Sequence, residues 1–211
     1  MTHHPAFTDG PLAPLPGTDR PRRALFVDRW GTLLEAPSGD PRRTYSQLTF
    51  TPGAVDALFR ATQAGWAIYL LGNEPAVARG HVKDARWLEF EAKLLTELSA
   101  QGVQVRRSYA CLDDPVHGTE PHCKDSVFLL PNTGAMYHAR QHDGIHLQES
   151  WVIGDSTLEL AAGWRAGCRT AGVQTGQGLT DGELEIDLEF DAATLADVLD
   201  EIQELAQAAN S

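Results

Sequence analysis

Short runs of apolar residues recur along the chain, and most of them end at glycine or at polar residues. Apolar runs of about four to eight residues bounded by turn residues are typical of buried strands. One run ends at Asp28, a second leads to Asn73 and a third leads to Asp155. The predicted strands cover residues 24–27, 67–71, 103–110, 151–153 and 168–173.

Longer segments between these runs carry apolar residues every three or four positions, which is the spacing of an amphipathic helix. Three of these segments are followed by a glycine (Gly65, Gly102 and Gly167), at positions where helices commonly end. Strands that alternate with helices predict a doubly wound, three-layer α/β/α sandwich of Rossmann-like type, with a mainly parallel sheet. The predicted helices cover residues 53–64, 82–100, 158–166 and 192–209.

Polar side chains follow three of the predicted strands directly, namely Asp28, Asn73 and Asp155. The carboxyl ends of parallel strands meet at one edge of a sheet, and ligands of open α/β sheets bind at that edge. The sequence therefore predicts a converging polar site built from these three residues.

The composition of the 211-residue chain, with 42% hydrophobic and 22% charged residues, is that of an ordinary globular protein. Its formal net charge of -12 argues against nucleic-acid binding, because a phosphate backbone requires a basic surface. No apolar run approaches the roughly 18–20 residues of a membrane span, and the start of the chain lacks a signal-peptide core. Three cysteines do not make a disulfide scaffold, so a cytoplasmic protein is expected.

Three segments resemble motifs of the haloacid dehalogenase (HAD) superfamily. Residues 26–33, Phe-Val-Asp-Arg-Trp-Gly-Thr-Leu, resemble the first motif, D-x-D-G-T, and residues 152–159, Val-Ile-Gly-Asp-Ser-Thr-Leu-Glu, resemble the fourth, G-D-x-x-x-D. Residues 71–80, Leu-Gly-Asn-Glu-Pro-Ala-Val-Ala-Arg-Gly, resemble the T-N-Q-S-G-I-A-R-G segment of one branch. That branch holds D-glycero-D-manno-heptose 1,7-bisphosphate phosphatase and histidinol-phosphate phosphatase. Order and spacing of the motifs agree over residues 24–176.

The resemblance implies a single HAD-like domain at residues 23–211, preceded by a flexible, proline-rich arm at residues 1–22. No long insertion separates Gly31 from the strand at 67–71, so no large cap domain is expected.

The resemblance also implies the chemistry of the site. Asp28 would be the nucleophile that forms an aspartyl-phosphate, which divides one difficult step into two easier ones. Magnesium would be held by Asp28, by the backbone carbonyl of Trp30 and by Asp155, with Glu159 at the position of the usual second aspartate.

The chain departs from the family pattern at three positions. Trp30 replaces the aspartate that acts as general acid and base, Gly72 replaces a phosphate-binding Thr or Ser, and Leu130 replaces the lysine of the third motif. A positioned acid or base is typically worth on the order of 10²–10⁴ in rate, so weak activity is expected. Glu74 is expected to repel anionic substrates. The expected phosphate pocket comprises Trp30, Gly72, Asn73, Arg79 and, as the nearest alternative cation, Lys124.

Three functions remain open from these residues. The first is a divergent phosphatase-like hydrolase of a small, sugar-phosphate-like substrate. The second is a catalytically inactive module that binds a small molecule or a partner protein. The third is hydrolysis of a carbon–halogen type bond, because haloacid dehalogenases carry tyrosine at the position of Trp30, although they keep the Ser or Thr and the Lys missing here. The orientation of Trp30 separates the first two, since a ring that fills the pocket would favour binding.

The loop at residues 111–135 lies where the resemblance implies a structural zinc site. Two thiolates and two imidazoles would make a closed tetrahedral site, with Asp113 as a substitute for one histidine. The spacing differs from that of the family, so a solvated loop whose zinc site has been lost stays open as the alternative. The candidate zinc ligands are Cys111, His117, His122 and Cys123.

Overall fold

The computed structural model describes residues 22–36 and 45–208, so the predicted arm at residues 1–22 lies outside the described residues apart from Arg22. Six strands form one sheet in the order β3-β2-β1-β4-β5-β6, and every neighbouring pair is parallel. The predicted parallel sheet is therefore confirmed. The strands are β1 (Ala24–Asp28), β2 (Ala67–Asn73), β3 (Val105–Cys111), β4 (Trp151–Gly154), β5 (Arg169–Val173) and β6 (Phe190–Ala192).

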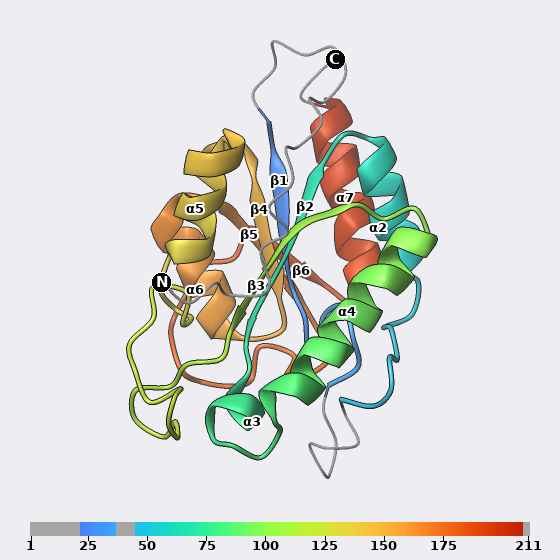
Figure 1. The fold of residues 1–211 in the computed structure, drawn as a ribbon. Coiled ribbons are helices and arrows are strands. Elements are labelled where there is room, and N and C mark those ends of the chain that lie inside the picture. The colour runs from blue at the N-terminus through green and yellow to red at the C-terminus, as the bar shows by residue number, and fades with distance from the viewer. Residues whose placement is uncertain (1–21, 37–44, 209–211) are drawn as a thin grey trace.

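Helices cover both faces of this sheet, which confirms the three-layer α/β/α sandwich. Helices α2, α4 and α7 lie on one side, and α5 and α6 lie on the other (Figure 1). None of the described helices combines the length and the apolar composition needed to cross a bilayer. The helices are α2 (Ala54–Gln63), α3 (Pro75–Ala78), α4 (Asp84–Ala100), α5 (Gly134–Asp143), the 3-10 helix η1 (Leu147–Glu149), α6 (Thr157–Ala166) and α7 (Leu195–Ala208).

Two hydrophobic cores fill the spaces between the layers, and the strands divide their side chains between them. Leu25 and Val27 of β1 point into the core under α2, α4 and α7, whereas Ala24 and Phe26 point into the core under α5 and α6. This alternation follows from the two-residue repeat of a strand. Strands buried on both faces read as continuous apolar runs, which is why the runs predicted the strands correctly.

Besides the short helices α3 and η1, the elements that the apolar pattern does not predict are α5 and β6. Helix α5 carries few large apolar residues, and its polar positions include the stacked pair His138 and His142, whose ring centroids are 4.1 Å apart. Strand β6 has three residues, none of them buried, and pairs only with β5. Both elements depend on neighbours that are distant in sequence, so the local pattern carries no signal for them.

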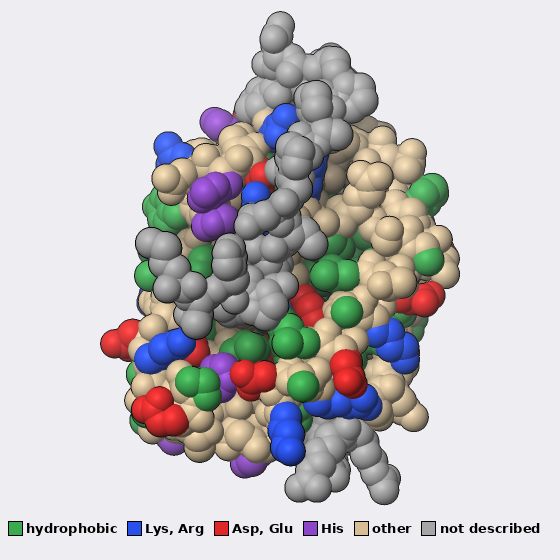
Figure 2. Space-filling view, in the orientation of Figure 1, with side chains coloured by type: hydrophobic (Ala, Val, Ile, Leu, Met, Phe, Trp, Pro, Cys, Tyr) green, Lys and Arg blue, Asp and Glu red, His purple; other side chains and the backbone are tan. Residues whose placement is uncertain are grey.

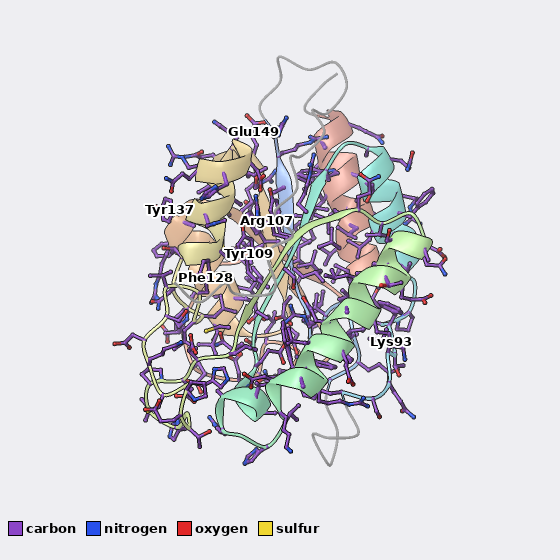
Figure 3. The ribbon with its side chains drawn as sticks, viewed as in Figure 1. Lys93, Arg107, Tyr109, Phe128, Tyr137 and Glu149 are labelled. Carbon is purple, nitrogen blue, oxygen red and sulfur yellow. The ribbon has the colours of Figure 1, made fainter. Side chains whose placement is uncertain are left out.

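Residues 112–133 contain no helix or strand, in agreement with the predicted loop. The loop packs on the α5 side of the sheet, where Phe128 stacks on Tyr109 of β3 with ring centroids 5.7 Å apart (Figure 3). It continues past the carboxyl ends of the strands, so it can contribute to a site at that edge.

Strand β1 lies at the centre of the sheet, between β2 and β4. Because the chain winds in opposite directions from this strand, the carboxyl end of β1 is the switch point at which open α/β sheets bind ligands. Asp28 is the last residue of β1, and Asp155 follows β4 directly.

Candidate active site

Three buried carboxylates meet at the carboxyl ends of β1 and β4. The ligand oxygens of Asp28, Asp155 and Glu159 all lie within 4.8 Å of one another. Asp28 comes from the end of β1, Asp155 from the loop after β4, and Glu159 from the first turn of α6. The fold therefore brings Asp28 and Asp155 together at this edge of the sheet, as predicted, and Asn73 lies at the same edge.

The backbone around Asp155 is shaped by two glycines. A Cβ atom at Gly31 or at Gly176 would lie 2.1 or 2.0 Å from Oδ2 of Asp155, and both glycines have positive φ, +86° and +62°. Glycine adopts this conformation without the steric penalty of a side chain. Two backbone segments thus close over the Asp155 carboxylate, and the N–H of Gln177 donates to its Oδ2 at 2.7 Å.

The Glu159 carboxylate is oriented by the residue that begins α6. The N–H of Ser156 donates to Oε1 of Glu159 and the Ser156 hydroxyl donates to Oε2, each at 2.6 Å. The Ser156 side chain also accepts from the backbone N–H of Glu159, which completes a capping box and satisfies free donors at the start of the helix. Glu159 therefore serves the helix as well as the carboxylate cluster.

In this cluster, burial and mutual repulsion outweigh the positive charge of the neighbouring Arg29. Burial, together with the charges of Glu159 and Asp155, raises the pKa of Asp28 well above its ordinary value. Burial also raises the pKa of Asp155 to about 6 and that of Glu159 to about 7. A divalent cation would relieve these repulsions, and hard oxygen ligands are those that magnesium prefers. The donor set thus fits a magnesium ion.

Trp30 lies on the wall of the pocket beside this cluster. Its ring stacks on Phe90 with centroids 5.3 Å apart and meets the edge of Tyr45 at 5.5 Å. Its Nε1 donates to Oε2 of Glu74 at 3.1 Å. The ring leaves a cavity of about 460 Å³ that Asp28 also lines, so Trp30 does not fill the pocket.

Glu74 is fully buried and is neutralised by Arg29. Its Oε1 lies 2.5 Å from Nη1 of Arg29, and its Oε2 accepts from Trp30 and from the hydroxyl of Tyr45. The expected repulsion of anionic substrates by Glu74 is therefore wrong, because this charge is paired beneath the pocket. Arg29 and Tyr45 were not among the predicted site residues. Arg29 is a neighbour of Asp28 in the first motif, but that position does not indicate its contact with Glu74.

Gly72 and Leu130, at the positions where the resemblance expects a threonine or serine and a lysine, form backbone and apolar surface. Gly72 has φ +148°, and a Cβ there would lie 3.1 Å from Oδ1 of Asp28. Leu130 lines the pocket and is buried in the core under α5 and α6. The Asn73 side chain accepts from the N–H of Leu130 at 2.9 Å and donates to its carbonyl at 3.2 Å. Asn73 thus ties the loop to β2.

The two predicted cations differ in position. Arg79 lines the pocket, and its Nη2 lies 3.5 Å from Oδ2 of Asp114. Lys124 is exposed, is not among the lining residues, and lies 3.7 Å from Oδ1 of Asp113. Acidic and basic side chains are interspersed on the lower part of the visible face, with hydrophobic side chains between them (Figure 2). Arg79 is thus the cation that the described pocket contains.

The predicted zinc ligands do not come together. The Sγ of Cys111 contacts the carbonyl of Asp113, whereas the exposed Cys123 contacts the carbonyl of Pro115. His122 is held between two carboxylates, at 3.2 Å from Asp113 and 3.0 Å from Asp84. Among residues 22–36 and 45–208, the possible metal ligands that do come together are the three carboxylates of Asp28, Asp155 and Glu159. The structure does not support the zinc site, because these side chains find partners within the loop and on α4.

The fold and the three-carboxylate site resemble those of HAD-type hydrolases. A family model described as HAD-hydrolase-like matches residues 130–205. Over these residues the chain is similar to this superfamily, and the relatives and structural neighbours described next point to the same family.

Among these relatives are heptose bisphosphate phosphatases. The D-glycero-beta-D-manno-heptose-1,7-bisphosphate 7-phosphatase of Pseudomonas aeruginosa is 29% identical over 158 residues, which is 75% of this chain and 84% of the relative. The enzyme of the same name from Pseudomonas putida is 29% identical over 172 residues, or 80% and 94%. The crystal structure of D,D-heptose 1.7-bisphosphate phosphatase from B. bronchiseptica, complexed with magnesium and phosphate, has a TM-score of 0.72 and 26% identity. The match covers 86% of this chain and 99% of that one.

Proposed function

We propose that the protein is a magnesium-dependent phosphohydrolase of the HAD type that acts on a small phosphorylated molecule, with Asp28 as the nucleophile. The observation that carries the proposal is the convergence of Asp28, Asp155 and Glu159 beside a pocket of about 460 Å³. The heptose bisphosphate phosphatase from B. bronchiseptica, with magnesium and phosphate bound, supports the same assignment by analogy.

The proposed roles follow from the geometry and the family resemblance. Asp28 and Asp155 would be the principal carboxylate ligands, and the family resemblance adds the backbone carbonyl of Trp30 as a third. Glu159 orients the cluster, since both of its oxygens already accept hydrogen bonds from Ser156. Bound magnesium would neutralise the charge on the transferring phosphoryl group.

Catalysis then uses the Asp28 carboxylate. One of its oxygens attacks phosphorus and forms an aspartyl-phosphate, and water later cleaves that intermediate. Arg79 is placed to meet a substrate phosphate at the pocket wall. Activity is expected to be weak, because Trp30 supplies no titratable group where an acid or base would contribute on the order of 10²–10⁴ in rate.

A silent binding module is the second candidate, supported by the contacts of Trp30 with Phe90, Tyr45 and Glu74. These contacts stabilise the ring in a position that offers a binding surface and no proton. The presence or absence of turnover that depends on Asp28 separates the two functions.

The test is magnesium-dependent release of phosphate from a panel of phosphomonoesters, with wild type compared with Asp28→Asn. We expect the substitution to reduce release at least about 100-fold, because it removes the nucleophile. Asp125→Asn is the matched control, since Asp125 is exposed and lies outside the pocket. Release that survives in Asp28→Asn would refute the assigned nucleophile. No release from any ester would favour the binding module.

A further inference from the structure

Among the described residues that line the pocket, no side chain outside the carboxylate cluster is placed to protonate a leaving group. Trp30 occupies the position of the general acid, and an indole N–H is not an acid in this sense. That N–H is also already donated to Glu74. Beyond the carboxylate cluster, the titratable side chains of described residues that line the pocket are Tyr45, Glu74, Arg79, Cys111, Asp113 and Asp114.

The acids among these residues are engaged elsewhere. The hydroxyl of Tyr45 donates to Glu74, and burial followed by the charge of Glu74 raises the pKa of Tyr45 far above the usual range. The N–H groups of His117 and Val116 hold the pKa of Asp114 below its usual value, so it carries no proton at neutral pH. Asp113 lies within 3.2 Å of the His122 ring.

The remaining two side chains are no better placed. The thiol of Cys111 is buried and contacts the carbonyl of Asp113, and burial raises its pKa. Arg79 pairs with Asp114, and a guanidinium does not give up its proton in proteins. A leaving oxygen therefore receives no proton from the described lining of this pocket, and departure without a proton is fast only when that oxygen is already acidic.

The aromatic wall of the pocket is planar and apolar. The polar atoms of Trp30 and Tyr45 are both directed to Glu74, so their rings offer surfaces and no free donors. This part of the wall offers no hydrogen-bond partners to sugar hydroxyls, whereas a flat ring can pack against aromatic side chains. The rest of the apolar lining is Pro75, Ala76, Ala78, Leu129, Leu130 and Leu158.

The charge of the pocket limits the number of phosphates. Arg79 is its one lining cation in the described ranges, and it is already paired with Asp114. One phosphate at the carboxylate cluster would be balanced by the bound magnesium. A second phosphate on the same substrate would find only Arg79 among the described lining residues, and Asp114 offsets part of that charge.

We infer that the substrate class is a phosphate monoester whose leaving oxygen is acidic and whose body is planar and largely apolar, that is, an aryl or enol phosphate. The inference rests on the proposed function and narrows its substrate.

The two steps of this reaction are balanced without a general acid. An Asp28 oxygen bonds to phosphorus, the bond from phosphorus to the aryl oxygen breaks, and the electron pair leaves as an aryloxide that takes its proton from solvent. Water then bonds to phosphorus, the bond to Asp28 breaks, and phosphate departs with one proton from that water while the other passes to solvent. Because no base assists water, the aspartyl-phosphate should accumulate.

The experiment compares phenyl phosphate with benzyl phosphate. Both carry a flat ring, but phenol, with a pKa near 10, is a far stronger acid than benzyl alcohol. For wild type with magnesium we expect kcat/KM to be at least about 100-fold higher for phenyl phosphate. A burst of phenol equal to the enzyme present should precede slower turnover. A phosphoryl adduct should appear in the intact mass of wild type and not of Asp28→Asn.

Two variants test the role of the wall residue itself. Trp30→Asp supplies an acid and should lower the ratio of kcat/KM for phenyl phosphate to that for benzyl phosphate at least about tenfold. Trp30→Phe supplies none, so that ratio should stay high whatever its absolute rate. If Trp30→Asp does not fold, the wild-type ratio of the two kcat/KM values by itself decides whether the leaving oxygen must be acidic.

The outcomes separate the inference from the function on which it rests. If turnover depends on Asp28 but kcat/KM for phenyl phosphate is within tenfold of that for benzyl phosphate, the inference is overturned and the proposed function stands. Turnover of alkyl sugar phosphates with neither ring ester as a substrate would do the same. No Asp28-dependent turnover of any ester would overturn the proposed function, and the inference with it.

Discussion

The buried contact between Glu74 and Arg29 makes a quantitative prediction for the substitution Glu74→Gln. The two side chains are fully buried, and Oε1 of Glu74 lies 2.5 Å from Nη1 of Arg29. The second oxygen accepts from Trp30 and Tyr45. Glutamine has nearly the same volume, so the substitution removes the charge and one acceptor without opening a cavity.

The expected loss follows from these contacts. Breaking a buried ion pair by removing one partner costs about 3–5 kcal/mol, since the other charge stays in the protein interior. Either orientation of the introduced amide also turns its NH₂ group toward an existing donor. Glu91 lies 3.5 Å from Nη2 of Arg29 and still balances part of its charge. We therefore expect the free energy of unfolding to fall by about 3 kcal/mol, a large share of the roughly 5–15 kcal/mol typical of a domain.

Urea denaturation followed by tryptophan fluorescence measures this loss by linear extrapolation. The matched control is Glu91→Gln, the same chemical change at a second buried carboxylate near Arg29. Glu91 also balances part of the Arg29 charge, but both of its oxygens lack hydrogen-bond partners among the described residues, so its substitution should lower the free energy of unfolding by less than Glu74→Gln does. Equal losses in the two variants, or a loss below about 1 kcal/mol in Glu74→Gln, would refute the assigned role of Glu74.

Two further substitutions test the strand ends. Gly72→Ala should destabilise the protein by about 1–3 kcal/mol, because alanine is strained at φ +148° and its Cβ would lie 3.1 Å from Oδ1 of Asp28. Gly65→Ala, with φ +85° and open space around it, is the control, and an equal loss would show that the contact with Asp28 adds nothing. Asp155→Asn should stabilise the metal-free protein at neutral pH by up to about 3 kcal/mol, because burial raises the Asp155 pKa from 3.8 to about 6 and makes its charged form unfavourable. This gain should disappear as the pH falls towards 4, where wild-type Asp155 is neutral in the folded state and increasingly so in the unfolded state. The rise in Tm on adding magnesium should also be smaller in the variant. Thermal unfolding with and without magnesium measures both effects.

The sequence by itself determined the architecture and the chemistry-bearing ends of β1 and β4. Strands buried on both faces appear as apolar runs and helices as a repeat of three to four residues, so local pattern was sufficient for most elements. Parallel strands bring their carboxyl ends to one edge, and that rule is enough to place Asp28 and Asp155 together. Glu159 followed from the spacing of one motif on α6, where neighbours in sequence are also neighbours in space.

Only the tertiary structure decided what surrounds those carboxylates. The partner of Arg29 lies 45 residues away in Glu74, so no local pattern could indicate that its charge is paired. The orientation of Trp30 depends on packing against Phe90 of α4, and the separation of Cys111 from Cys123 depends on the path of a loop without regular structure. Such contacts are set by packing and hydrogen bonding between distant segments, which residue types and spacing do not encode.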